Sequence, residues 1–214
     1  APSTPAPAGT VSNIPPAQGQ TGPQAMVTAA PHAPPLAGDG PLSADPLVRG
    51  AYLARMGDCV ACHTAPGGQP FAGGLAMASP LGTIYSSNIT PDKDTGIGGY
   101  SFEDFDRAVR HGVAKGKGNL YPAMPYENYR FMSESDIRAL YMYLMNDVKP
   151  VKNEVKTTEL SFPFNLRFGM RAWNWLAMSG DSGFKPMEGN DQQIRGQYLV
   201  EGAGHCAACH SPRT

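Results

Sequence analysis

Apolar residues recur at helical spacing in three stretches of the chain, and each stretch is bounded by residues that start or stop helices. Pro46 opens the first stretch, where its missing N–H has no partner to lose. Ser101 and Asp104 form a capping-box pattern at the start of the second, and Ser133 can cap the third. The pattern predicts helices over residues 46–56, 101–111 and 133–148.

The remaining segments have the composition of loops or extended chain. Glycine and proline are frequent after residue 63, and residues 83–92 form an extended stretch that closes in a turn. Eleven of the 21 prolines fall within residues 1–46. Such a tract buries too little apolar surface to offset the entropy of ordering it. We therefore expect an all-α, loop-rich fold with a Pro/Ala-rich N-terminal arm over residues 1–45, either a plain linker or an arm lying across a partner subunit.

The pattern Cys-x-x-Cys-His occurs twice and uses all four cysteines of the chain. It is the attachment signature of c-type haem, in which two thiols become thioethers and the histidine binds iron. Cysteines three apart on a helical turn point to the same side, so both reach one porphyrin edge. A thioredoxin-like redox pair would need a βαβ pattern, which the sequence does not show. A zinc site built from both copies would leave the haem-type histidine of each copy without its role. The residues are Cys59, Cys62 and His63 in the first copy, and Cys206, Cys209 and His210 in the second.

A second internal repeat precedes these motifs. Residues 48–53 match residues 194–199, including the Arg-Gly-x-Tyr-Leu core, and each copy runs into its own attachment motif. The repeat predicts a duplicated domain: a first haem domain over 46–149, a connector over 150–190, and the start of a second domain over 191–214. Because so few residues follow the second motif, we expect the chain to be a fragment of a longer protein.

The first haem iron needs a sixth ligand or an open position. Met124 is the best candidate, because Pro122 and Pro125 hold its loop extended and a thioether favours reduced iron. Met77 and Met132 are rivals, and His111 is a weaker candidate at a helix end. His32 is read as an incidental residue of the arm.

Charge and composition exclude several functions. The formal net charge is −1, so the Arg and aromatic residues around 162–176 predict a packing brace between domains or against a partner, and no nucleic-acid surface. Asp92, Asp94 and Glu103 have a calcium-loop spacing whose glycines are misplaced. The first residue is Ala and no leader or long apolar run is present, which predicts a mature periplasmic chain without a membrane span.

Further stretches carry a specific resemblance to a known family. They are FAGG at 71–74, TIY at 83–85, SNITPD at 87–92, TGIG at 95–98, LYPAMPY at 120–126 and ALY at 139–141. Over residues 46–214 the chain resembles the multihaem cytochrome c subunit of bacterial membrane-associated dehydrogenases. Residues 1–45 match no family that we can name.

This resemblance implies small helical cytochrome c domains of the class I type. It implies haem c at both motifs, Met124 as the first iron's ligand, Asn88 in a loop close to the first haem, and a third haem domain in a full-length member. It implies a catalytic partner of quinoprotein, flavoprotein or molybdopterin type at the periplasmic face of the inner membrane, with electrons passed toward ubiquinone through a C-terminal part that this chain lacks.

Three functions follow as hypotheses. The leading one is an electron-transfer subunit that does no bond chemistry of its own, because a closed His/Met iron offers no substrate site. The second is a dihaem peroxidase-like enzyme, which needs an open iron. The third is a free periplasmic dihaem carrier. The substrate of a partner dehydrogenase is not encoded here.

Overall fold

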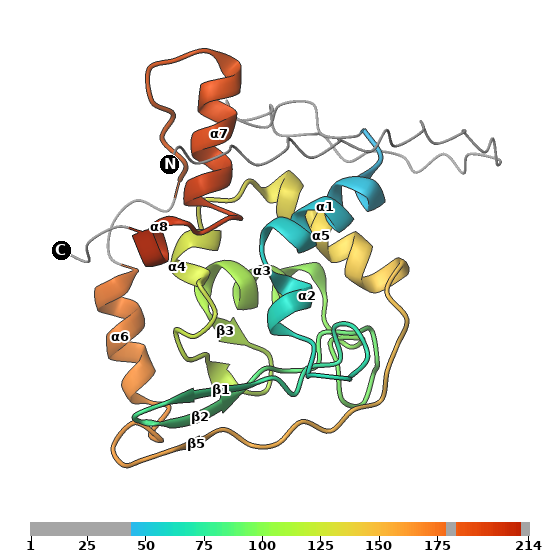
Figure 1. Ribbon diagram of the computed structural model, residues 1–214, viewed down its shortest axis with the longest axis vertical. Coiled ribbons are helices and arrows are strands. Elements are labelled where there is room, and N and C mark those ends of the chain that lie inside the picture. The colour runs from blue at the N-terminus through green and yellow to red at the C-terminus, as the bar shows by residue number, and fades with distance from the viewer. Residues whose placement is uncertain (1–43, 179–182, 211–214) are drawn as a thin grey trace, which may run out of the picture. The chain divides into compact units, whose positions relative to one another are not determined.

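The computed structural model describes residues 44–178 and 183–210 (Figure 1). Nearly all of the predicted arm over 1–45, His32 included, lies outside these residues. The helices are α1 (Pro46–Met56), α2 (Cys59–Cys62), α3 (Phe102–His111), α4 (Tyr126–Tyr129), α5 (Glu134–Asn146), α6 (Gly169–Ala177), α7 (Asp191–Glu201) and α8 (Ala207–His210). The strands are β1 (Ala76–Ser79), β2 (Gly82–Tyr85), β3 (Val113–Ala114), β4 (Gly118–Asn119) and β5 (Glu159–Leu160).

The strands correct the expectation of an all-α chain. The described residues contain helices, loops and two small antiparallel sheets, one ordered β1-β2-β5 and one formed by β3 and β4. Of the stretch predicted as extended, only the part up to Tyr85 lies in a strand. Strands of two to four residues are too short to give a readable alternation, and β5 pairs with β2 from far along the chain, with Thr83 opposite Glu159.

The predicted starts of the three helices are confirmed by their caps, whereas α5 ends at Asn146, two residues before the predicted end. The Asp45 side chain accepts a hydrogen bond from the Leu47 N–H ahead of α1. Ser101 and Asp104 form the expected capping box of α3, and Ser133 accepts from the backbone N–H of Asp136 in α5. Each cap satisfies a backbone donor that would otherwise lack a partner at the start of its helix.

The core lies where α1 crosses α5. Leu53 of α1 and Ile137 and Leu144 of α5 are almost completely buried. The crossing is close because Gly50 has no side chain: a Cβ there would lie 2.2 Å from the Ala139 carbonyl oxygen. Burying a Leu or Ile side chain contributes about 1.5–3 kcal/mol, so this crossing is a main source of the stability of the first helical unit.

The stretch predicted to be a connector makes hydrogen bonds with the residues before it. Arg167 Nη1 donates to the Asn119 carbonyl oxygen at 3.1 Å, and the Tyr126 hydroxyl donates to Asn174 Oδ1 of α6 at 2.8 Å. Its aromatic residues are split: Trp173 is partly buried, whereas Trp175 is 79 % exposed. Within residues 44–178 and 183–210, no helix has the length and apolar character that crossing a membrane requires.

Candidate haem site

The first attachment motif forms the short helix α2 directly after α1. Asp58 has a left-handed backbone conformation (φ 51°) that turns the chain from α1 into α2. The Cys62 N–H donates to the Asp58 carbonyl oxygen at 2.9 Å, and the His63 N–H donates to the Cys59 carbonyl oxygen at 2.9 Å. One helical turn therefore carries both cysteines, as the spacing predicted. Cys59 is partly buried beside the core and Cys62 is exposed.

His63 is held in one orientation by a backbone carbonyl. Its Nδ1 lies 2.6 Å from the Ser87 carbonyl oxygen, which can only accept a hydrogen bond. Nδ1 must therefore carry the proton, and Nε2 keeps the lone pair that a metal ion needs. Burial lowers the pKa of His63, and the bond to Ser87 opposes that effect in part. The lowered pKa keeps the imidazole neutral, which is the ligating form.

The Ser87 carbonyl is placed by a glycine-dependent contact. Gly73 (φ +73°) donates its N–H to the His63 carbonyl oxygen at 2.7 Å. A Cβ on Gly73 would lie 2.4 Å from the Ser87 carbonyl carbon and 2.5 Å from the Asn88 nitrogen. Only glycine allows the two backbones to approach this closely in a left-handed conformation. Gly73 and Ser87 join the candidate site in the structure, and the motif did not indicate them because neither carries a ligating side chain.

Asn88 is a buried residue that braces this loop. Its Nδ2 donates to the Val151 carbonyl oxygen at 2.7 Å and to Thr95 Oγ1 at 3.0 Å. Its Oδ1 accepts from the Thr90 backbone N–H at 2.9 Å and from the Thr90 hydroxyl at 2.7 Å. The amide thus ties the Ser87 loop to the connector. Its closeness to a haem stays a prediction.

The donor set of the first motif fits a covalently attached haem. Burial, reinforced by the neighbouring Cys62, raises the pKa of Cys59 to about 12, and burial also raises the pKa of Cys62, so both thiols stay protonated at neutral pH. Among the described residues no group of three or more His, Cys, Asp or Glu side chains could hold a metal ion, so the geometry gives no support to a zinc site built from both motifs. Two protonated thiols on one turn and a neutral, oriented imidazole match the needs of haem c.

A buried guanidinium adds to this fit. Arg130 follows α4, and its Nε and Nη1 atoms are buried without a hydrogen-bond partner among the described residues. The guanidinium also lies over the Phe131 ring, with Cζ 5.0 Å from the ring centroid. The carboxylate arms of a cofactor would supply the hydrogen-bond partner that the two buried nitrogens lack. Haem has such arms.

Met124 lies in the turn before α4 and is partly buried against the hydrophobic core, as are Cys59 and Val60. Its rivals have other surroundings: Met132 is buried in the core itself, and Met77 lies in β1 opposite Ile84. His111 is exposed in the last turn of α3. These positions leave the thioether ligand a prediction.

The second motif forms α8 and lies beside the first. Cys206, Cys209 and His210 are all exposed. Their neighbour His205 lies with Nε2 3.7 Å from the Asp58 carboxylate, which directly precedes the first motif. The Tyr129 ring packs edge-on against the His205 imidazole. The Tyr129 hydroxyl donates to the Gly57 carbonyl oxygen at 2.6 Å. The structure thus brings the two attachment motifs together, which the sequence did not indicate.

The calcium-like spacing belongs to a turn. Asp92 Oδ1 accepts from the Thr95 N–H and the Thr95 hydroxyl, each at 2.7 Å, which lowers the pKa of Asp92. Asp94 instead lies 3.1 Å from Lys152 Nζ. The carboxylates serve the turn and an ion pair, and they do not converge.

Comparison with known proteins finds one family model and several relatives that match this chain. The family model of cytochrome c matches residues 47–147. The chain contains a cytochrome c domain. It is 55% identical to the gluconate 2-dehydrogenase cytochrome c subunit of Pantoea cypripedii over 79% of this chain and 39% of that protein. It is 52% identical to the cytochrome c subunit of the quinone alcohol dehydrogenase of Gluconacetobacter polyoxogenes over 77% of this chain and 36% of that protein. It is 46% identical to the fructose dehydrogenase cytochrome subunit of Gluconobacter japonicus over 78% of this chain and 35% of that protein.

These findings confirm the resemblance predicted from the sequence. The chain spans less than two fifths of the length of these relatives. Each of these relatives is named as the cytochrome subunit of a dehydrogenase. A cytochrome c domain implies covalently bound haem c, and the geometry at His63 is consistent with it.

Proposed function

We propose that this chain is an electron-transfer subunit that relays electrons from a dehydrogenase catalytic subunit through covalently bound haems toward membrane ubiquinone. The observation that carries the proposal is the geometry of His63, whose Nδ1 is bonded to the Ser87 carbonyl beside two cysteines on one helical turn. Bound haem c would supply reversible one-electron chemistry at iron. The protein contributes attachment, ligand orientation and a partly buried setting that tunes the potential.

The first site would use Cys59 and Cys62 for the thioethers, His63 Nε2 for the iron, and the Met124 thioether on the other side. The bond from His63 to Ser87 strengthens the imidazole as a donor and prevents the ring from turning. A filled sixth position would exclude substrates, which favours electron transfer over catalysis.

The second site would use the same residue types at Cys206, Cys209 and His210. Two haems are therefore proposed, in a first domain over 46–149 and in a second domain that begins near Asp191, where the side chain of Asn190 caps α7. Residues 150–190 would be the connector between them.

The relatives' names suggest the partner. The relatives are named as cytochrome subunits of gluconate, quinone alcohol and fructose dehydrogenases, so the partner would be a dehydrogenase catalytic subunit. The family resemblance adds that this subunit would be of quinoprotein, flavoprotein or molybdopterin type, at the periplasmic face of the bacterial inner membrane. Haem attachment on the oxidising side of a membrane supports the same compartment.

Purification of the native complex tests this proposal. The chain is isolated under mild conditions, its haems are counted from the mass of the intact polypeptide, and the copurified subunit is identified. Gluconate, ethanol and fructose are then added in turn while the haem absorption bands are followed. We expect haem at both motifs of this chain, a third haem where the purified polypeptide carries the further domain of a full-length member, and reduction by one class of substrate.

The alternatives give different results in this experiment. A chain that isolates alone and is reduced by none of the substrates contradicts the subunit role and supports a free carrier. Peroxide-driven turnover with a five-coordinate first haem supports the peroxidase-like enzyme. A Cys62→Ala variant, which lacks one thioether, should lose stable attachment at the first site only, whereas Cys209→Ala should lose it at the second only.

A further inference from the structure

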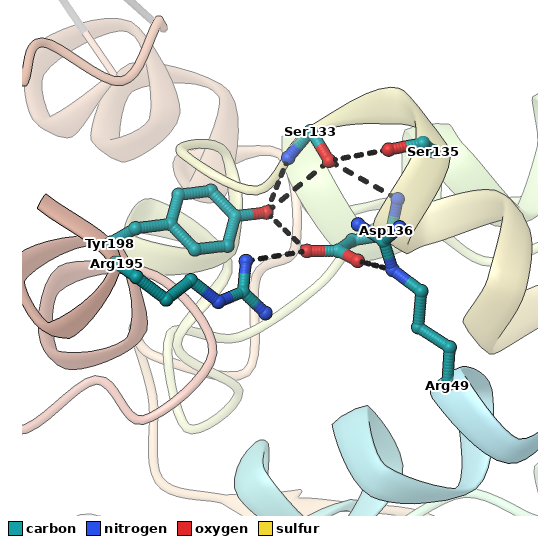
Figure 2. A network of polar contacts seen from close by, with 6 residues as sticks. All are labelled: Arg49, Ser133, Ser135, Asp136, Arg195 and Tyr198. Carbon is teal, nitrogen blue, oxygen red and sulfur yellow. Dashed lines mark hydrogen bonds and ion pairs between the residues drawn. The ribbon is translucent and has the colours of Figure 1, made fainter. Parts of the chain in front are cut away.

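A fully buried carboxylate joins the two halves of the internal repeat (Figure 2). Asp136 lies in the first turn of α5 and is 0 % exposed. Its Oδ1 pairs with Arg49 Nε of α1. Its Oδ2 accepts a hydrogen bond from the Tyr198 hydroxyl at 2.7 Å and lies 3.7 Å from Arg195 Nη1. One oxygen thus faces the first domain and the other faces α7.

The arrangement depends on the repeat. Arg49 and Arg195 occupy the same place in the repeated pattern, so two equivalent guanidiniums meet one carboxylate from opposite sides. Tyr198 adds a second contact, since its hydroxyl also accepts from the Ser133 N–H at 2.8 Å. Ser133 is the cap of α5, so α7 is bonded to the end of that helix and to its first turn.

Because its charges are buried, this junction allows only one position of α7 against α5. A carboxylate without access to water needs all of its partners, so a shift of α7 would leave a buried charge unpaired. Exposed ion pairs, in contrast, exchange readily with water and fix little. The cluster therefore holds α7 in one place against α5.

The helix so held leads directly into the second attachment motif. The Asn128 side chain donates to the carbonyl oxygen of Glu201, the last residue of α7, at 3.1 Å. Ala203 is completely buried in the core of the first domain. His205, which precedes Cys206, then reaches the Asp58 carboxylate beside the first motif. From Tyr198 to His205 the chain is bonded step by step to the first domain.

We propose that Asp136 is a positioning residue that sets the distance and orientation between the two haems, and so the rate of electron transfer between them. The inference rests on the proposed function, because it needs haem at both motifs. Electron transfer rates fall steeply with the separation of donor and acceptor, and small misplacements of reacting groups are costly. Asp136 touches neither motif and acts through α7.

The test compares Asp136→Asn with the wild type in the full-length protein purified with its complex. The haem count and the potential of each haem are measured first. A wild-type protein that lacks haem at either motif would contradict the proposed function. The coupled circular dichroism of the haem absorption bands then reports the relative orientation of the haems. Fast photoreduction reports the rate of electron exchange between them. We expect a changed dichroism signal and at least tenfold slower exchange, with each haem's potential kept.

Four further variants make the test decisive. Asp106→Asn removes the same charge from a partly buried ion pair with Arg110 inside α3 and should leave both readouts unchanged. Tyr198→Phe and Arg195→Met each remove a partner of Oδ2 and keep the Arg49 pair, so they test the junction if Asp136→Asn fails to fold. Tyr198→Phe also removes the hydrogen bond from the Ser133 N–H. Arg195→Lys should restore part of the exchange rate lost in Arg195→Met. Wild-type dichroism and exchange rates in Tyr198→Phe and Arg195→Met would overturn the proposal.

Discussion

The two copies of the repeated pattern form the same helix but bury different residues. In the first copy, Gly50 lies against the backbone of α5 and Leu53 is 1 % exposed. In the second copy, a Cβ on Gly196 would meet no atom within 4 Å among the described residues outside its own helix. There the buried residue is Tyr198, whereas its counterpart Tyr52 is only partly buried. A conserved local pattern therefore specifies a helix and leaves its packing partner to the rest of the chain.

The attachment motifs differ in the same way. His63 is oriented by the Ser87 carbonyl and is surrounded by loops that fix it. His210 is exposed at the end of α8. The first site is shaped by sequence-distant backbone, and the second is placed by the junction at Asp136. The following changes test how far this difference extends.

Removal of the Met124 side chain should have the largest effect and should affect one site only. Met124→Ala is expected to lower the potential of the first haem on the order of 0.2 V, equivalent to about 5 kcal/mol for one electron, because the thioether favours reduced iron. A redox titration followed by absorption spectroscopy checks this. Met132→Leu, a buried control in the core, should keep both potentials. An unchanged first-haem potential in Met124→Ala would refute the assignment of Met124 as the iron ligand.

Matched glycine substitutions test the packing of the two copies. Gly50→Ala should destabilise the protein by about 3 kcal/mol, because the new Cβ overlaps the Ala139 carbonyl oxygen. Gly196→Ala should stabilise it by about 0.5–1 kcal/mol, because alanine is the better helix former and the site is open. Chemical denaturation of both variants measures the difference. Equal destabilisation would show that α7 packs through Gly196 as α1 does through Gly50.

A second pair of glycines tests the orientation of His63. Gly73→Ala should destabilise the protein by about 2 kcal/mol and raise the first-haem potential, because displacing the Ser87 carbonyl weakens the bond that makes the imidazole a stronger donor. Gly67→Ala has the same left-handed strain (φ +72°) but no neighbour within 4 Å. It should cost about 1 kcal/mol and leave the potential unchanged. Both haem potentials and thermal unfolding are measured. A shift in the second haem's potential would contradict the claim that Gly73 acts on the first site alone, through the Ser87 carbonyl and His63.

Much of the first domain was predictable from the sequence, because its signals are local. The caps at Ser101 and Ser133, the proline at the start of α1 and the cysteine spacing each act within a few residues. The family resemblance came from equally local motifs. The small sheets escaped prediction because their strands are only two to four residues long, and β5 in addition pairs with β2 from far along the chain.

The parts that could not be predicted depend on distant partners. Ser87 acts through its carbonyl, which every residue has, so no residue type marks its role. Asp136 reads as an ordinary acidic residue in the first turn of a helix, where it favours the dipole. Its burial by Tyr198 appears only when the chain is folded. The repeat placed Arg49 and Arg195 in register, but the carboxylate that they share lies outside the repeat.

The smallest predicted effect is a pH dependence that belongs to the second copy. Burial, with the Asp136 carboxylate beside it, raises the pKa of Tyr198 above its ordinary value of 10.0. A group whose pKa is raised by folding contributes its full stability at pH values below its unfolded pKa. For Tyr198 this stability is lost as the pH rises above about 10, by no more than about 1.4 kcal/mol per pH unit. Tyr198→Phe should therefore be less stable than the wild type at pH 8 because of the lost hydrogen bonds, and the gap should narrow at pH 10.5. Urea denaturation at both pH values measures the gap. Because the comparison at pH 8 is the internal control, a gap that stays constant would show that the Tyr198 hydroxyl is not buried against the carboxylate, and that α7 is held by other contacts.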